Sequence, residues 1–93
     1  MNIAEYRALL SSAKTGLLEV GATVNEGGSE WCSFVEGSVD SRGVEIFCSD
    51  DRDGVTVDYF ELGEALHGEW DFESLDLALE AATQWLSSAI LPK

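Results

Sequence analysis

The sequence has few basic residues, one proline, one histidine and no long apolar run. Only 5 of its 93 residues are Lys or Arg, whereas 18 are Asp or Glu, so the formal net charge is −13. This charge disfavours binding to nucleic acid phosphates or to anionic lipid. The apolar runs are far shorter than the roughly 18 residues of a membrane span, and the N-terminus lacks the features of a secretory signal. We expect a cytoplasmic protein with a basic partner and no contact with membrane or nucleic acid.

The length and composition predict one folded domain over residues 1–93. A chain of 10.1 kDa can enclose only one core. Its hydrophobic residues make up 45% of the chain and its aromatic residues 10%. That apolar content distinguishes it from an acidic disordered tail.

The two cysteines, Cys32 and Cys48, lack the C-x-x-C spacing that zinc sites and dithiol chemistry use. We expect two reduced thiols packed in the fold. In the alternative, the two cysteines form a disulfide, which requires that their strands be neighbours and that the compartment be oxidising.

The N-terminal residues predict a helix followed by a strand. Asn2 with Glu5 resembles a capping box, and the apolar spacing that follows predicts a helix over residues 2–14, ended by Gly16. Residues 17–25 then alternate apolar and polar, which predicts a strand. In the competing interpretation the helix continues, but Gly16 and Gly21 would each cost it roughly 1 kcal/mol.

Residues 25–60 predict the remainder of a four-stranded meander. Asn25–Ser29 is typical of a hairpin turn, with a second strand over 30–36 and a polar connection over 37–43. Residues 44–48 and 55–60 alternate as strands three and four, and a four-residue loop would pair Asp50 with Val55. Two opposite faces follow: one has Ile46, Cys48, Val57 and Tyr59, and the other has Glu45, Phe47, Asp58 and Phe60.

The C-terminal residues predict a loop and a helix. Gly63 and Gly68 break any helix over 62–70, which we interpret as a loop. Asp71 or Ser74 can cap the final helix. Its apolar stripe consists of Leu75, Ala78, Leu79, Ala82, Leu86 and Ala89. The predicted fold class is α+β: a four-stranded antiparallel meander between two helices (αββββα), with both helices on one face.

Motifs for metal or enzyme chemistry fail on inspection. Asp51-Arg52-Asp53-Gly54 resembles the middle of an EF-hand loop, but the anchoring positions fall on Ser49 and Phe60. His67 has no second ligand at zinc spacing, and the cysteines lie in predicted strands, where nothing lowers a thiol pKa. There is no phosphate-binding glycine loop. We expect no catalytic activity, no metal and no cofactor.

The acidic residues are concentrated in one part of the chain. Residues 53–80 hold nine acids and no Lys or Arg, interleaved with aromatic residues. Acids steer a cationic partner and aromatics supply buried contact area, which predicts a binding surface for a basic protein. Its candidate residues are Glu45, Phe47, Asp50, Asp51, Asp53, Asp58, Phe60, Glu61, Glu64, Glu69, Trp70 and Asp71. In the alternative interpretation the aromatics are core and the acids serve solubility or adaptation to salt.

The C-terminal half resembles a known group of proteins. The hairpin over 44–61, followed by Trp70-Asp71-Phe72-Glu73-Ser74-Leu75 and then by Leu79-Glu80-Ala81-Ala82 and Trp85-Leu86, is similar to bacterial immunity proteins of contact-dependent growth inhibition and other polymorphic toxin systems. The resemblance implies binding and neutralisation of a cognate toxin domain encoded upstream, often a basic nuclease, by blocking its active site or substrate groove. It supplies no motif residues.

Two other function classes remain open beside this one. The chain could mimic nucleic acid and inhibit host DNA-binding proteins, and it would then compete with DNA for several unrelated proteins. It could also be a small-ligand-binding module, which a thermal-shift panel of ligands would detect.

Overall fold

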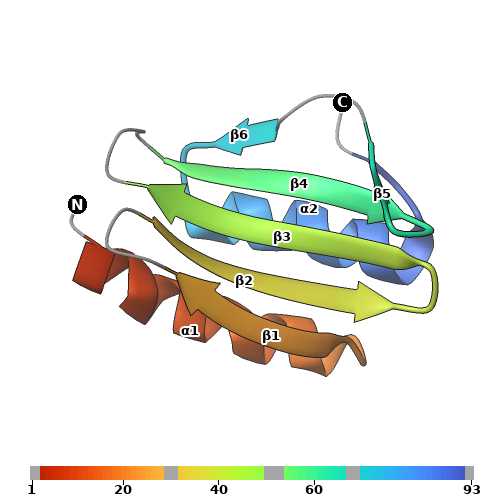
Figure 1. The fold of residues 1–93 in the computed structure, drawn as a ribbon, viewed down its shortest axis with the longest axis horizontal. Coiled ribbons are helices and arrows are strands. Elements are labelled where there is room, and N and C mark those ends of the chain that lie inside the picture. Colours follow the sequence, from red (N-terminus) through yellow and green to blue (C-terminus); the bar gives the residue numbers. More distant parts are fainter. Residues whose placement is uncertain (1–2, 29–31, 50–53, 67–69, 92–93) are drawn as a thin grey trace.

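The computed structural model describes residues 3–28, 32–49, 54–66 and 70–91. It has the α+β architecture that the sequence predicts: an antiparallel sheet with an N-terminal and a C-terminal helix on one face (Figure 1). The sheet order is β1-β2-β3-β4-β5, and β6 pairs with β4. Neither helix in this part of the chain is long and apolar enough to cross a bilayer.

Helix α1 spans Ile3–Glu19, so the prediction of a strand over 17–25 is wrong for residues 17–22, and only residues 23–25 lie in a strand. Leu10, Ala13 and Leu17 recur at helical spacing and are all buried, which outweighs the cost of Gly16. Gly16 also permits a close approach between the helices, since a Cβ there would lie 2.7 Å from Leu79 Cδ2. The helix ends instead at Gly21, whose φ of 82° suits a left-handed C-terminal residue.

Strands β1 (Thr23–Gly28) and β2 (Cys32–Val39) form the first hairpin. The predicted turn at 25–29 is wrong, because Asn25–Gly28 pairs in register with residues 33–36. Gly27 fits within a strand because the Phe34 ring covers it: a Cβ on Gly27 would lie 2.8 Å from Phe34 Cζ. Strand β2 also continues past residue 37, so the predicted connection over 37–43 shortens to a turn at Asp40 and Ser41.

Strands β3 (Arg42–Ser49) and β4 (Val55–Glu61) form the centre of the sheet. Ile46 pairs with Val57, a register two residues away from the predicted one. Because side chains alternate with a period of two, this shift keeps every residue on its predicted face. Ile46, Cys48, Val57 and Tyr59 are buried together, as the sequence predicts.

The predicted loop over 62–70 contains two short strands. Strands β5 (Glu64–Ala65) and β6 (Trp70–Phe72) both pair with the outer edge of β4. The turn into β5 places Leu62 and Gly63 at φ values of 53° and 81°, the positive pair of a type I′ turn. Trp70 packs edge-on against Tyr59, with ring centroids 4.8 Å apart. The sheet therefore extends beyond the four strands of the predicted meander, with β5 and β6 outside β4.

Helix α2 spans Leu75–Ser88 and begins at Ser74, whose hydroxyl accepts the Leu77 N–H at 3.3 Å. Its buried side adds Trp85 to the predicted stripe, whereas Ala89 is exposed. Two hydrogen bonds join the helix to β3. The Trp85 indole donates to the Gly43 carbonyl oxygen at 3.1 Å, and Arg42 Nη2 donates to the Leu86 carbonyl oxygen at 2.7 Å.

The bond from Arg42 to the end of α2 predicts a stability difference between two cations. Arg42→Met should lower the free energy of unfolding by about 1.5–3 kcal/mol, because a charge-assisted hydrogen bond at a helix C-terminus is lost. Lys14→Met is the matched control. It removes the same charge from an exposed pair with Glu26 at 3.6 Å and should cost under about 1 kcal/mol. Urea denaturation measures both, and equal losses would contradict this role of Arg42.

Two buried groups predict a loss of stability at alkaline pH. Burial raises the pKa of Cys48 from 9.0 to about 11 and that of Tyr59 from 10.0 to about 12. The folded state thus favours the neutral thiol and the neutral phenol. Their contribution to the free energy of unfolding is complete below pH 9.0 and is lost as the pH rises through the pKa of each group in the folded protein. Denaturation across this range should show a falling free energy of unfolding. In a Cys32→Ser background, adding Cys48→Ala should flatten the earlier part of that fall; an unchanged slope would count against it.

Candidate binding surface

One face of the sheet is covered by the helices and the other is not. Along β3 and β4 the core side chains alternate with side chains that point away from the helices, most of them half-buried and one, Thr56, buried. We call this second side of β1–β4 the open face. Figure 1 shows it toward the viewer, with α1 and α2 behind the sheet.

Three carboxylates lie next to one another across the open face. Glu36 on β2 pairs with Glu45 on β3, and Glu45 pairs with Asp58 on β4. We call these three residues the carboxylate row. Directly opposite residues of an antiparallel pair have Cβ atoms about 4.5–5.5 Å apart, and like charges at that spacing destabilise the sheet. Repulsion within the carboxylate row therefore destabilises the folded state.

The environment of Glu45 disfavours its charged form. The pKa of Glu45 is raised above its ordinary value of 4.5, first by desolvation and then by the charges of Asp58 and Glu36. Glu45 is half-buried between two strands. Its carboxylate would gain from a cation brought by a partner, because such a charge would oppose both of the neighbouring acids.

Aromatic side chains flank the carboxylate row on both sides. Phe34 pairs with Phe47 in the next row of the sheet, and Phe60 lies opposite Gly43 in the row beyond Glu45. All three rings are half-buried. The open face therefore combines an acidic centre with partly exposed aromatic rings on both sides of it.

Basic side chains of the described residues lie away from the open face. Arg7 Nε donates to Ser33 Oγ at 3.1 Å, Lys14 pairs with Glu26, and Arg42 donates to α2. Arg52 and Lys93 fall outside the described segments. Within those segments no Lys or Arg alternates onto the open face, and Arg42 lies at its end with its guanidinium bonded to α2.

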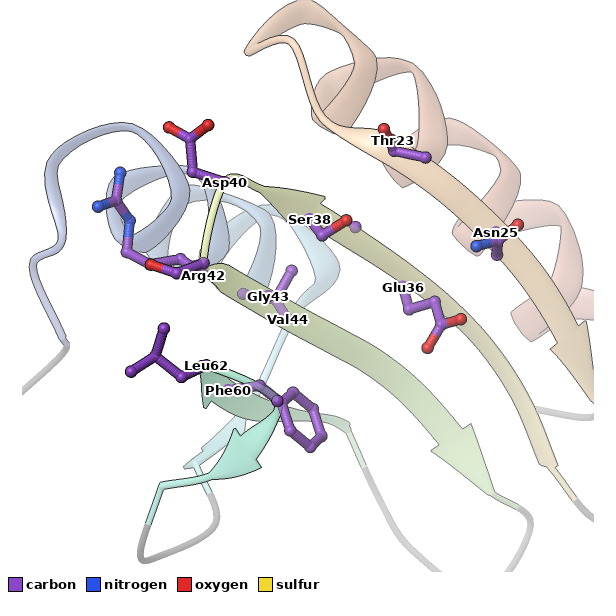
Figure 2. Close-up of a pocket in the computed structure, with 13 residues that line it drawn as sticks. Thr23, Asn25, Glu36, Ser38, Asp40, Arg42, Gly43, Val44, Phe60 and Leu62 are labelled. Atoms are coloured by element: carbon purple, nitrogen blue, oxygen red, sulfur yellow. The ribbon is translucent and has the colours of Figure 1, made fainter.

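A groove of about 460 Å³ crosses one end of the open face. Its walls come from β1 and β2 on one side and from Phe60 and Leu62 on the other, with Gly43 between them (Figure 2). Glu36 lines the groove and connects it to the carboxylate row. Asp40 and Arg42 lie at its far end.

The structure brings together part of the predicted surface. Glu45, Phe47, Asp58 and Phe60 share the open face, as predicted. Asp71 lies at the edge of that face, where its carboxylate accepts the Thr56 hydroxyl at 2.7 Å. The candidates Asp50, Asp51, Asp53 and Glu69 lie outside the described residues, as does most of the EF-hand-like motif.

Other predicted residues lie elsewhere. Glu61 follows the alternation of Val57 and Tyr59 toward the helix side, and Glu64 pairs with it across the turn. Trp70 packs with Tyr59 on the core side, so we leave it out of the surface. The sequence analysis missed Phe34 and Glu36. Their alternation with the buried Val35 was the available signal.

The arrangement offers recognition chemistry. Within the described segments there is no group of three or more His, Cys, Asp or Glu side chains placed to hold a metal ion. Cys48 is a free, buried thiol. Comparisons with protein-family models, with curated proteins and with solved structures gave no match.

The raised pKa of Glu45 predicts a stabilising substitution. Glu45→Gln should raise the free energy of unfolding by about 0.2–1 kcal/mol at about pH 7, because it removes a desolvated charge from between two others. As the pH falls through the raised pKa of Glu45 in the folded protein, the wild-type carboxylate is protonated and its charge is lost. The stability advantage of Glu45→Gln should therefore disappear below pH 4.5.

Glu80→Gln is the control for this prediction, since Glu80 is exposed on α2. Urea denaturation at both pH values decides it. A destabilised Glu45→Gln variant at neutral pH would show that the carboxylate serves the fold.

Proposed function

We propose that this protein is a cytoplasmic immunity protein whose open face binds and neutralises a basic toxin domain. The observation that carries the proposal is the carboxylate row, which holds Glu45 at a raised pKa between Glu36 and Asp58. Folding alone gives no reason for this arrangement. The positive charges of a cationic partner would offset the repulsion among the three carboxylates and so contribute to the free energy of binding.

The aromatic borders favour a protein partner over a small cation. Phe34 and Phe47 on one side and Phe60 on the other extend the surface beyond the carboxylates. Such rings contribute most when a partner surface covers them and excludes water around the charged contacts. A free ion would use the acids and leave the rings exposed.

Neutralisation would follow from where such a partner carries its positive charge. A nuclease concentrates Lys and Arg where it binds the phosphates of its substrate. The carboxylate row would engage those side chains and cover the substrate groove. The resemblance of the C-terminal half to immunity proteins supports the same proposal.

The first experiment is titration calorimetry at about 0.15 M salt. The protein is titrated with the C-terminal domain of the protein encoded immediately upstream, in an inactivated form. One-to-one binding that suppresses the activity of the active domain supports the proposal. Absence of binding overturns it, and competition with DNA for several unrelated basic proteins would favour the nucleic-acid mimic instead.

Reversal of one charge on each side of β4 tests the site. Asp58→Lys should slow association with the upstream domain by about three- to tenfold and reduce its dependence on salt, because Asp58 belongs to the carboxylate row. Glu61→Lys makes the same charge change three residues along the strand, on the helix side, and should have a smaller effect. Stopped-flow rates at several salt concentrations give both values. Equal slowing would mean that net charge, rather than the open face, governs binding.

A further inference from the structure

The groove has a floor that no side chain fills. Gly43 and Gly27 both face the open side of the sheet, and each lies opposite a phenylalanine. The Phe34 ring lies over Gly27. At Gly43, in contrast, the nearest atoms to a built Cβ are the Gly37 carbonyl oxygen at 3.6 Å and Phe60 Cβ at 3.7 Å. The Phe60 ring thus stands beside the gap and forms a wall of the groove.

The edge of the groove carries a leucine that neither the turn nor the core requires. Leu62 has a φ of 53° and is 78% exposed. The left-handed conformation is unfavourable for leucine, and type I′ turns prefer Asn at this position before Gly63. Its N–H donates to the Ser41 carbonyl oxygen at 2.8 Å, which fixes the turn against the β2–β3 connection. A strained, exposed apolar residue held in place at a cavity points to a contact with a ligand.

The charges at the groove favour a cation with an apolar stem. Phe60 and Leu62 form an apolar wall, and Glu36 brings the carboxylate row to the mouth. Arg42 is the one described cation near the groove, and its guanidinium donates to the end of α2 and lies 6.0 Å from the Trp85 ring centroid. Figure 2 shows its side chain turned toward the helix layer, away from Phe60. The cavity is therefore left for a positive group from outside.

We propose that this groove is the subsite for an arginine side chain of the protein partner. The inference rests on the proposed function and specifies its recognition chemistry. The alkyl stem lies over Gly43 against Leu62, and the guanidinium stacks on Phe60 and reaches Glu36, the carboxylate that lines the groove. Arginine fits better than lysine, because a planar guanidinium stacks on aromatic rings and forks to neighbouring carboxylates, whereas an ammonium is compact and strongly hydrated.

Two blocked peptides test the subsite, one of alternating glycine and arginine and one with lysine in place of arginine. Amide NMR shifts of the full-length protein report affinity and location. The arginine peptide should bind about three- to tenfold more tightly. Its largest shifts should fall on residues 36, 43, 60 and 62.

Two substitutions alter the groove at positions where the fold should tolerate them: one fills its floor and the other removes its apolar edge. Gly43→Val places a β-branched side chain in a strand where Cβ meets only ordinary van der Waals neighbours. Leu62→Asn creates the Asn-Gly pair that type I′ turns prefer. Neither should lower the thermal midpoint of the wild-type protein, and both should weaken the arginine peptide to the affinity of the lysine peptide. Thr15→Val, at an exposed position on α1, is the control and should change neither affinity.

The outcomes separate the subsite from the proposed function. If binding of the basic upstream domain depends on Glu45 but is unchanged by Gly43→Val and Leu62→Asn, the open face is the site and the arginine subsite is wrong. Equal affinity for the two peptides also overturns the subsite. If the upstream domain does not bind while the arginine preference and its loss in both variants are observed, the subsite stands and the toxin partner is wrong.

Discussion

The period of two in β3 and β4 is the constraint on which the other features depend. The core is formed where Val44, Ile46 and Cys48 on one strand, and Val55, Val57 and Tyr59 on the other, face the helices and are buried with them. Each of these residues sends its neighbour to the opposite side. Burial of the core thus brings Glu45 and Asp58 together, and the pairing of β2 adds Glu36.

This same alternation decided how much the sequence could predict. Where the periodicity was unbroken, with a period of two in β3 and β4 and helical spacing in α2, the elements and their faces were predicted correctly, although the register between β3 and β4 was two residues away. It also gave Glu45, Phe47, Asp58 and Phe60 as one surface. The prediction failed where glycine has two meanings. Gly16 looked like the end of a helix but lies where α1 and α2 approach closely, and Gly27 looked like a turn but lies beneath an aromatic ring.

Errors in the candidate surface follow from strand pairings that were not predicted. Phe34 and Glu36 lie within the predicted strand over 30–36, but that strand had no predicted register, so they were not seen as neighbours of Phe47 and Glu45. Treating 62–70 as a loop likewise hid the pairing of Trp70 with Val57, which directs its ring toward the core. Contacts between distant strands set these positions, and a local pattern does not contain them. The unfilled groove floor at Gly43 could likewise be recognised only in the three-dimensional structure.

The indole of Trp85 lies beneath the groove, on the core side of the sheet, where it can report on changes in the groove. Its N–H bonds to the carbonyl oxygen of Gly43, the residue that forms the groove floor on the other side of the sheet. Trp85 is 3% exposed, so solvent does not dominate its surroundings. A small displacement of the β3 backbone would change this hydrogen bond and with it the energy of the indole excited state. The fold therefore contains its own optical probe, separated from any occupant of the groove by a single layer of backbone.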